Sequence, residues 1–88
     1  DDAKVTNSLV ADDCIILGEV DNAILFRGVK VGTGTVIKNS ILFQDVFTGT
    51  DVHLNYVLAG KNAVICDGVE LSGLQQLASY IAKGKSIG

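Results

Sequence analysis

A short string made of one asparagine, one small or aromatic residue and two apolar residues recurs four times along the chain. The copies begin at Asn7, Asn22, Asn39 and Asn55, so they are 15, 17 and 16 residues apart. Between them, an aliphatic residue returns about every sixth position and is followed mainly by small or polar residues. Repetition at a fixed spacing indicates a stack of similar structural units.

The six-residue period indicates which kind of stack the chain forms. An amphipathic helix would show apolar residues three and four positions apart, and a hairpin meander would show strict alternation between Asn-Gly turns. In a β-helix, each hexad supplies a short strand whose aliphatic residue points into a prism, and Gly, Asn or Asp accepts an unusual backbone angle at the corner. Three faces follow from the aligned positions 25, 42 and 59, positions 31, 48 and 65, and positions 37, 54 and 71, all steps of 17.

The predicted fold is all-β, a single-stranded parallel β-helix of about four coils over residues 7–71. Residues 1–6 are a lead-in, and residues 72–88 are a tail that breaks the six-residue rhythm. Asparagines are predicted to mark one corner, where stacked side chains can hydrogen-bond along the axis. Apolar residues in the tail are spaced three and four positions apart, as on one face of a helix: Leu74, Leu77, Ala78 and Ile81. This spacing predicts a short helix or turn, followed by a strand-like end.

The composition excludes several functional classes. With 48% hydrophobic and 19% charged residues, the chain does not have the composition of a disordered protein. A net charge of −3 argues against a nucleic-acid partner. No apolar run reaches the ~18 residues of a membrane-spanning helix, and the N-terminus lacks a signal-peptide pattern. We therefore expect a cytoplasmic domain without a membrane partner and, because it contains no Met, a piece of a longer protein.

Three stretches narrow the match to a known family. Residues 7–12 (NSLVAD), 18–32 (GEVDNAILFRGVKVG) and 36–41 (VIKNSI) resemble the C-terminal hexapeptide-repeat domain of bacterial glucose-1-phosphate adenylyltransferase. Residues 80–85 (YIAKGK) are similar to the regulatory, D-type subunit of that glycogen-biosynthesis enzyme. The resemblance also implies that the prism coils in a left-handed sense.

The resemblance implies a longer parent enzyme. Its N-terminal nucleotidyltransferase domain, absent from these residues, would join ATP and glucose 1-phosphate to give ADP-glucose and pyrophosphate, with Mg²⁺ bound there. No G-x-x-x-x-G-K-[ST] phosphate loop occurs in this chain, so we predict in it no catalytic residue, cofactor or metal ligand. The domain's implied roles are association with other adenylyltransferase subunits, as a homo- or hetero-oligomer, and a share in allosteric control.

Three lysines are candidates for the effector-facing role. Lys61 lies in a short loop before the last coil, while Lys83 and Lys85 flank a glycine in the tail. In the family, basic residues in roughly these places meet anionic sugar-phosphate effectors, which ammonium groups bind through charge-assisted hydrogen bonds. Three solvated surface lysines would give the same pattern.

Three phenylalanines are candidates for an interface. Phe26 and Phe43 share an outward hexad position in successive coils, and Phe47 is predicted to lie one corner further along the same strip. Such an apolar strip predicts a subunit or interdomain contact, or a seat for the tail folding back over it.

The remaining reactive side chains are isolated. Cys14 is predicted to face inward and Cys66 outward, with no companion that indicates zinc. His53, the only histidine, lies at an outward position. Hexapeptide-repeat acyltransferases use one prism histidine as a general base, so a truncated acyltransferase stays open as an alternative, beside a solvated histidine. A purely structural oligomerisation module is the third hypothesis.

Overall fold

The computed structural model describes residues 3–88, and their regular secondary structure consists of β-strands alone. The strands are β1 (Lys4–Thr6), β2 (Leu9–Val10), β3 (Ile15–Ile16), β4 (Glu19–Asp21), β5 (Ile24–Leu25), β6 (Lys30–Val31), β7 (Val36–Lys38), β8 (Ile41–Leu42), β9 (Phe47–Thr48), β10 (His53–Asn55), β11 (Val57–Ala59), β12 (Val64–Ile65), β13 (Glu70–Ser72), β14 (Ser79–Ile81) and β15 (Ser86–Ile87).

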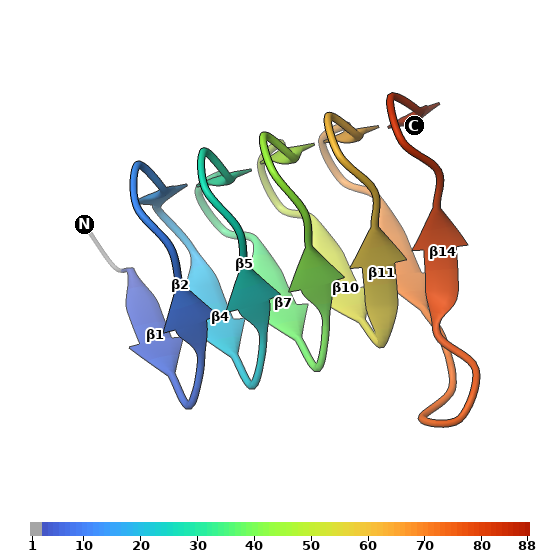
Figure 1. Ribbon diagram of the computed structural model, residues 1–88, viewed down its shortest axis with the longest axis horizontal. Coiled ribbons are helices and arrows are strands. Elements are labelled where there is room, and N and C mark those ends of the chain that lie inside the picture. Colours follow the sequence, from blue (N-terminus) through green and yellow to red (C-terminus); the bar gives the residue numbers. More distant parts are fainter. Residues whose placement is uncertain (1–2) are drawn as a thin grey trace.

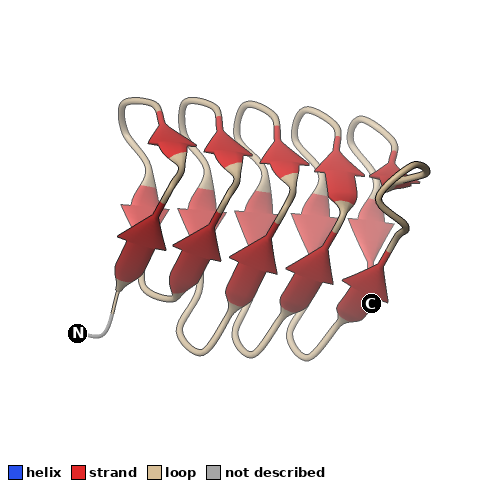
Figure 2. Cartoon of the chain, turned by 90° about the horizontal axis from the view of Figure 1, so that it is seen from below, coloured by secondary structure: helices blue, strands red, loops and turns tan. Residues whose placement is uncertain are grey.

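Each strand pairs in parallel with the strand three places later, so the chain winds through three sheets in turn (Figure 1). Sheet A has the order β1-β4-β7-β10-β13, sheet B the order β2-β5-β8-β11-β14, and sheet C the order β3-β6-β9-β12-β15. The sheets form the three faces of a prism (Figure 2). We call one strand from each sheet, in chain order, a tier. The predicted parallel β-helix is confirmed, and its left hand stays a prediction.

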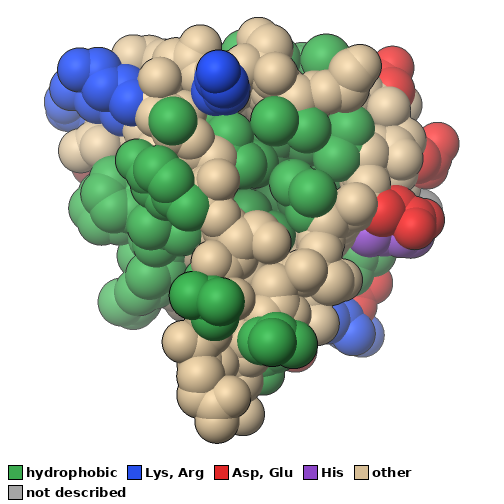
Figure 3. All heavy atoms as spheres, turned by 90° about the vertical axis from the view of Figure 1, so that its right-hand side faces the viewer, with side chains coloured by type: hydrophobic (Ala, Val, Ile, Leu, Met, Phe, Trp, Pro, Cys, Tyr) green, Lys and Arg blue, Asp and Glu red, His purple; other side chains and the backbone are tan. Residues whose placement is uncertain are grey.

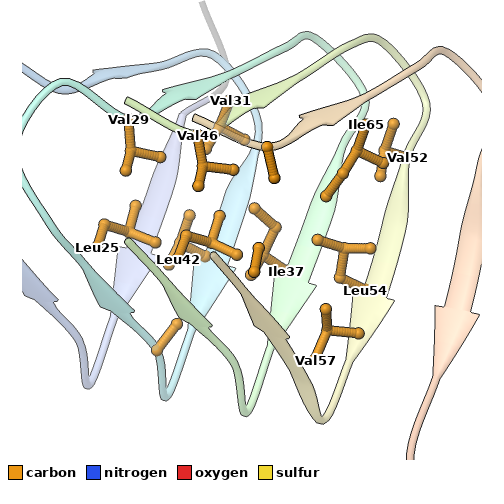
Figure 4. Close-up of a cluster of buried hydrophobic side chains, with 14 of the residues drawn as sticks. Leu25, Val29, Val31, Ile37, Leu42, Val46, Val52, Leu54, Val57 and Ile65 are labelled. Carbon is orange, nitrogen blue, oxygen red and sulfur yellow. The ribbon is translucent and has the colours of Figure 1, made fainter. Parts of the chain in front are cut away.

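The predicted 17-residue alignment is the register of the sheets. Leu25 pairs with Leu42 in sheet B, Val31 with Thr48 in sheet C, and Ile37 with Leu54 in sheet A. The apolar side chains of these pairs point into the prism (Figure 4), and Thr48 is also fully buried. The largest buried side chains are no more than 2% exposed: Leu25, Ile37, Leu42, Leu54 and Ile65. Because each tier contributes one ring of side chains, the core is a column along the axis.

A ladder of asparagine amides runs along the corner between sheets A and B, as predicted. The Asn7 amide donates to the Asn22 oxygen at 3.2 Å, Asn22 to Asn39 at 2.7 Å, and Asn39 to Asn55 at 2.9 Å. The first three asparagines have φ between 49° and 55°, a left-handed backbone that Asn tolerates well. In the fourth copy Tyr56 takes this conformation, with φ of 56°.

The prism extends beyond the predicted boundaries, residues 7 and 71, at both ends. β1 lies in the expected lead-in, and β14 and β15 lie in the expected tail. Of the two predicted alternatives for the start of the tail, helix or turn, the structure has the turn: Leu74 and Leu77 form an isolated antiparallel bridge, while Ile81 is 3% exposed and joins the core. The predicted turn and strand-like end are present. The step from Leu58 to its partner Tyr80 is 22 residues, so this coil carries a longer corner, which projects from the prism (Figure 1).

The first coil is shorter because its corner between sheets C and A contains only Leu17 and Gly18. Gly18 is buried, and a Cβ atom there would lie 2.3 Å from the carbonyl oxygen of Thr35. Only glycine permits this close approach of two coils.

The described residues are compact, with a Cα radius of gyration of 11.1 Å. Within residues 3–88 there is no helix with the length and apolar character needed to cross a membrane.

Candidate effector and subunit-contact surfaces

The outer surface of sheet A is polar. Side chains alternate along each strand, so the residues on either side of an inward-facing residue point to solvent. On sheet A these are Lys4, Thr6, Glu19, Asp21, Val36, Lys38, His53, Asn55, Glu70 and Ser72. Five of these ten residues carry a charge at neutral pH, which suits a face that stays in water.

The outer surface of sheet B carries no charged residue. The same alternation places two columns on it, one beginning at Leu9 and the other at Ala11. The columns are Leu9, Ile24, Ile41, Leu58 and Tyr80, and Ala11, Phe26, Phe43, Gly60 and Ala82. We call these ten residues the B face. Phe26 and Phe43 stack within it, with ring centroids 5.0 Å apart and an interplanar angle of 18°.

The three phenylalanines do not form one strip. Phe26 and Phe43 are half-buried on the B face, whereas Phe47 is 45% exposed and lies in β9, on sheet C. There it lines a shallow hollow of about 290 Å³ together with Ile15 and Lys30. The corner between the two sheets separates Phe47 from the stacked pair because the chain turns through Gln44 and Asp45. The role of these residues as an interface stays a prediction.

Lys61 and Lys83 lie at equivalent positions of two stacked turns, at the corner between sheets B and C. The backbone N–H of Gly84 donates to the Lys61 carbonyl oxygen at 2.8 Å, just as Asn62 donates to Gln44 at 2.9 Å in the turn before. Stacked parallel strands are about 4.8 Å apart, so the two exposed lysines start from neighbouring points on the backbone. The structure therefore brings together two of the three predicted effector-facing residues.

Lys85 occupies a different kind of position. Its equivalents in the earlier tiers are residues of the core column: Cys14, Val29, Val46 and Ala63. Lys85 itself is exposed, because no further tier covers it. Figure 3 views this end of the prism and shows Lys and Arg side chains along its upper edge, hydrophobic side chains over the left side and centre, and acidic side chains on the right.

His53 is exposed on the polar face of sheet A. Its Nδ1 lies 3.6 Å from Glu70 Oε2, and the two side chains are 54% and 75% exposed. Among residues 3–88 this is the one contact within 4 Å between a nitrogen of a basic side chain and a carboxylate oxygen. The two side chains line an open hollow of about 300 Å³ on this face. Both remain more than half exposed, so the pair is weak support for acyl transfer.

Both cysteines lie as predicted. Cys14 is half-buried against the core, with its Sγ 3.2 Å from the Phe26 carbonyl oxygen, and Cys66 is exposed. In the part of the chain that the structure describes, no three His, Cys, Asp or Glu side chains gather into a group that could hold a metal ion.

Sequence reasoning missed the aliphatic column of the B face. The signal was present, because the third letter of the Asn-x-apolar-apolar string is Leu9, Ile24 and Ile41 in its first three copies. The hexad pattern draws attention to inward positions, and only the register shows that these outward residues form one continuous column.

Comparison with known proteins agrees with this fold. The family described as "GlmU-like, C-terminal hexapeptide" matches residues 1–78. The Bacillus subtilis glycogen biosynthesis protein GlgD is 42% identical over 93% of this chain and 24% of its own length. The glucose-1-phosphate adenylyltransferase of Desulfitobacterium hafniense is 41% identical over 72% of this chain and 16% of its own length. That of Clostridium beijerinckii is 34% identical over 94% of this chain and 22% of its own length.

The chain thus spans a quarter or less of these three curated relatives. A match over most of the chain, together with three parallel sheets in the predicted register, places it in one family. The chain belongs to the GlmU-like C-terminal hexapeptide family and is related to the glucose-1-phosphate adenylyltransferases and GlgD of glycogen biosynthesis.

Proposed function

We propose that this chain is the assembly and regulatory domain of a glucose-1-phosphate adenylyltransferase, in a subunit of the D type. The observation that carries the proposal is the 42% identity to GlgD over 93% of the chain. A rigid prism that exposes an uncharged face and a basic corner suits subunit contact and effector binding better than bond-breaking chemistry. ADP-glucose formation and its Mg²⁺ belong to the rest of the protein, which we place in the cytoplasm.

The effector would be an anionic sugar phosphate bound at the corner that carries Lys61 and Lys83. Two ammonium groups on turns about 4.8 Å apart repel one another, and a phosphate group between them converts that repulsion into two charge-assisted hydrogen bonds. Lys85, at the exposed end of the same coil, would reach a second phosphate. A sugar bisphosphate has the size and charge for this arrangement.

The acyltransferase and structural-module hypotheses predict different experimental results. A truncated acyltransferase requires binding of acetyl-CoA, with His53 as general base, and the exposed pair of His53 and Glu70 gives little support to it. A purely structural module requires that effector response survive when the surface of the prism is altered. Binding of acetyl-CoA to the full-length protein would favour the acyltransferase.

The test is an effector titration of the full-length assembly with fructose 1,6-bisphosphate. Replacing Lys61 by alanine removes one charge-assisted hydrogen bond, worth roughly 1.5–3 kcal/mol, so half-maximal activation should need about ten times more effector or above. Lys83→Ala should raise the effector concentration for half-maximal activation by a similar factor. Lys38→Ala is the matched control, because this lysine is also exposed but lies on sheet A. Unaltered activation in both Lys61→Ala and Lys83→Ala would show that the effector does not bind at this corner.

A further inference from the structure

The C-terminal end of the prism leaves backbone donors without a strand to pair with. In sheet C, the outward residue of each strand donates its backbone N–H to a carbonyl oxygen of the next tier, as Val64 does to Lys85 at 2.8 Å. Ser86 is the equivalent of Val64 in the last tier, and no further tier follows it within residues 3–88. An open strand edge of this kind can pair with another chain.

The N-terminal end offers the complementary acceptors. In sheet C, carbonyl oxygens of the second, third and fourth tiers accept the N–H groups of the tier before, each at 3.0 Å; they belong to Val29, Val46 and Ala63. Cys14 is their equivalent in the first tier, and no earlier tier precedes it within residues 3–88. One end of sheet C is therefore a donor edge and the other an acceptor edge, in the register by which successive tiers already meet.

The core column is also open at its ends. Val5 and Val10 point inward in the first tier, yet they are 44% and 39% exposed. Their partners in the second tier, Val20 and Leu25, are no more than 1% exposed. At the opposite end, Figure 3 shows hydrophobic side chains over the left side and the centre. Each end thus exposes apolar surface that another tier would cover.

These two ends fit one another because every tier repeats one plan. The last tier of one copy, placed below the first tier of a second, would continue all three sheets and the core column. Such a head-to-tail contact is heterologous and does not close on itself, so it would generate filaments. A prism with open ends therefore needs a feature that prevents stacking.

One residue of the C-terminal end departs from the plan. Lys85 occupies a row of the core column whose other members are Cys14, Val29, Val46 and Ala63. Among the described residues of the inward rows, it is the only one that carries a charge. It is exposed, and the long stem of a lysine can lie on apolar surface while the ammonium group stays in water.

A further tier would enclose this ammonium group in the core column. The inward side chains that it would meet on the first tier of a second copy carry no negative charge: Val5, Val10, Cys14 and Ile16. Burial of a charge without a partner is strongly unfavourable. Charged residues that point inward at an open edge are one of the means by which natural proteins prevent edge pairing.

We propose that Lys85 closes the C-terminal end of the prism, because its charge prevents this end from stacking on the N-terminal end of a second copy. The inference goes beyond the proposed function and holds whichever surface joins the subunits. Lys85 then acts at the end of the stack as well as in the phosphate contact proposed above.

The first test is the mass of the full-length protein, measured by sedimentation at several concentrations. Lys85→Val restores the residue type of Val29 and Val46, so the ends should associate at least about 100-fold more tightly than in the wild type. The mass should then rise with concentration without a plateau. Lys83→Val is the matched control, because it removes the same charge at an exposed corner position outside the core column. A wild-type mass for folded Lys85→Val would overturn the proposal.

A second substitution identifies the surface to which the altered end binds. Val5→Lys places a charge in an inward row of the first tier, at a side chain that is already 44% exposed. Added to Lys85→Val, it should return the mass to the wild-type value, because head-to-tail stacking would again enclose an ammonium group. Continued association of the double variant would mean that the N-terminal end is not the partner and would contradict the proposal.

Lys85→Glu separates this inference from effector binding. It keeps a charge at the end of the prism but removes the ammonium group that would reach a phosphate. The mass should stay at the wild-type value, while half-maximal activation by fructose 1,6-bisphosphate should need more effector. Association of Lys85→Glu as strong as that of Lys85→Val would show that charge does not prevent stacking. If Lys85→Val associates but activation is unchanged in both variants, the inference stands and only the phosphate contact of Lys85 fails.

Discussion

Leu42→Ala is expected to lower the free energy of unfolding by about 3 kcal/mol, with a range of about 2–5 kcal/mol for buried leucines. Leu42 is fully buried in the middle tier, between Leu25 and Ala59 in sheet B. A cavity there cannot be filled by movement of a free end, because paired tiers lie on both sides. Chemical denaturation of the variant, followed by circular dichroism, measures the change.

The control is Leu9→Ala, the same substitution on the same sheet but at a side chain that is 70% exposed. Its cost to the folded chain at low concentration should be below about 0.5 kcal/mol. Equal losses for Leu42→Ala and Leu9→Ala would contradict the assignment of inward and outward positions, on which the register depends.

Gly32→Ala is the second substitution with a large expected effect, about 3 kcal/mol. A Cβ atom at Gly32 would lie 2.2 Å from the carbonyl oxygen of Gly49 and 2.6 Å from its carbonyl carbon. Both are backbone atoms of the next coil, so relief requires the two coils to move apart and weakens the hydrogen bond from Gly32 N–H to Thr48 O, 3.1 Å long. The melting temperature of the variant reports this loss.

Gly68→Ala separates crowding from backbone strain. Gly68 has φ of 76° and nothing within 4 Å of the added Cβ, so only the left-handed backbone is penalised, by about 1 kcal/mol. A Gly68→Ala variant that loses as much stability as Gly32→Ala would mean that close coil packing is not what makes Gly32 necessary.

The sequence predicts the register because inward positions are constrained by their neighbours along the axis. Leu25, Leu42 and Ala59 repeat at steps of 17 since each must fit the ring above and the ring below. The asparagine corner was predictable for a related reason, because few residues other than Gly tolerate φ near 50° and can also bond along the axis.

The tail was harder to predict because an insertion hides its period. Ile81 follows Ala59 by 22 residues, and Ile87 follows Ile65 by 22, which is the usual step of 17 lengthened by five. Inside the insertion, Leu74 and Leu77 are three residues apart, as on one face of a helix, but they belong to a turn. The bridge between them pairs their backbone N–H and C=O groups without a helix. Aligning the end of the chain with the earlier coils would have revealed both pairs.

Which residues share a candidate surface depends on how successive coils stack, and the sequence of one coil does not show this. Lys61 and Lys83 become neighbours only through the hydrogen bond from Gly84 to Lys61, and Phe47 is separated from Phe43 by the corner between two sheets. The sequence identified the residue types. Which of them share a face follows from the register and from the longer last corner.

The measurement that tests the central claim most directly compares the full-length protein with a version lacking residues 1–88. From the proposed function we predict a smaller oligomer by light scattering and loss of the response to fructose 1,6-bisphosphate. An unchanged mass together with an unchanged effector response would contradict an assembly and regulatory role for this prism.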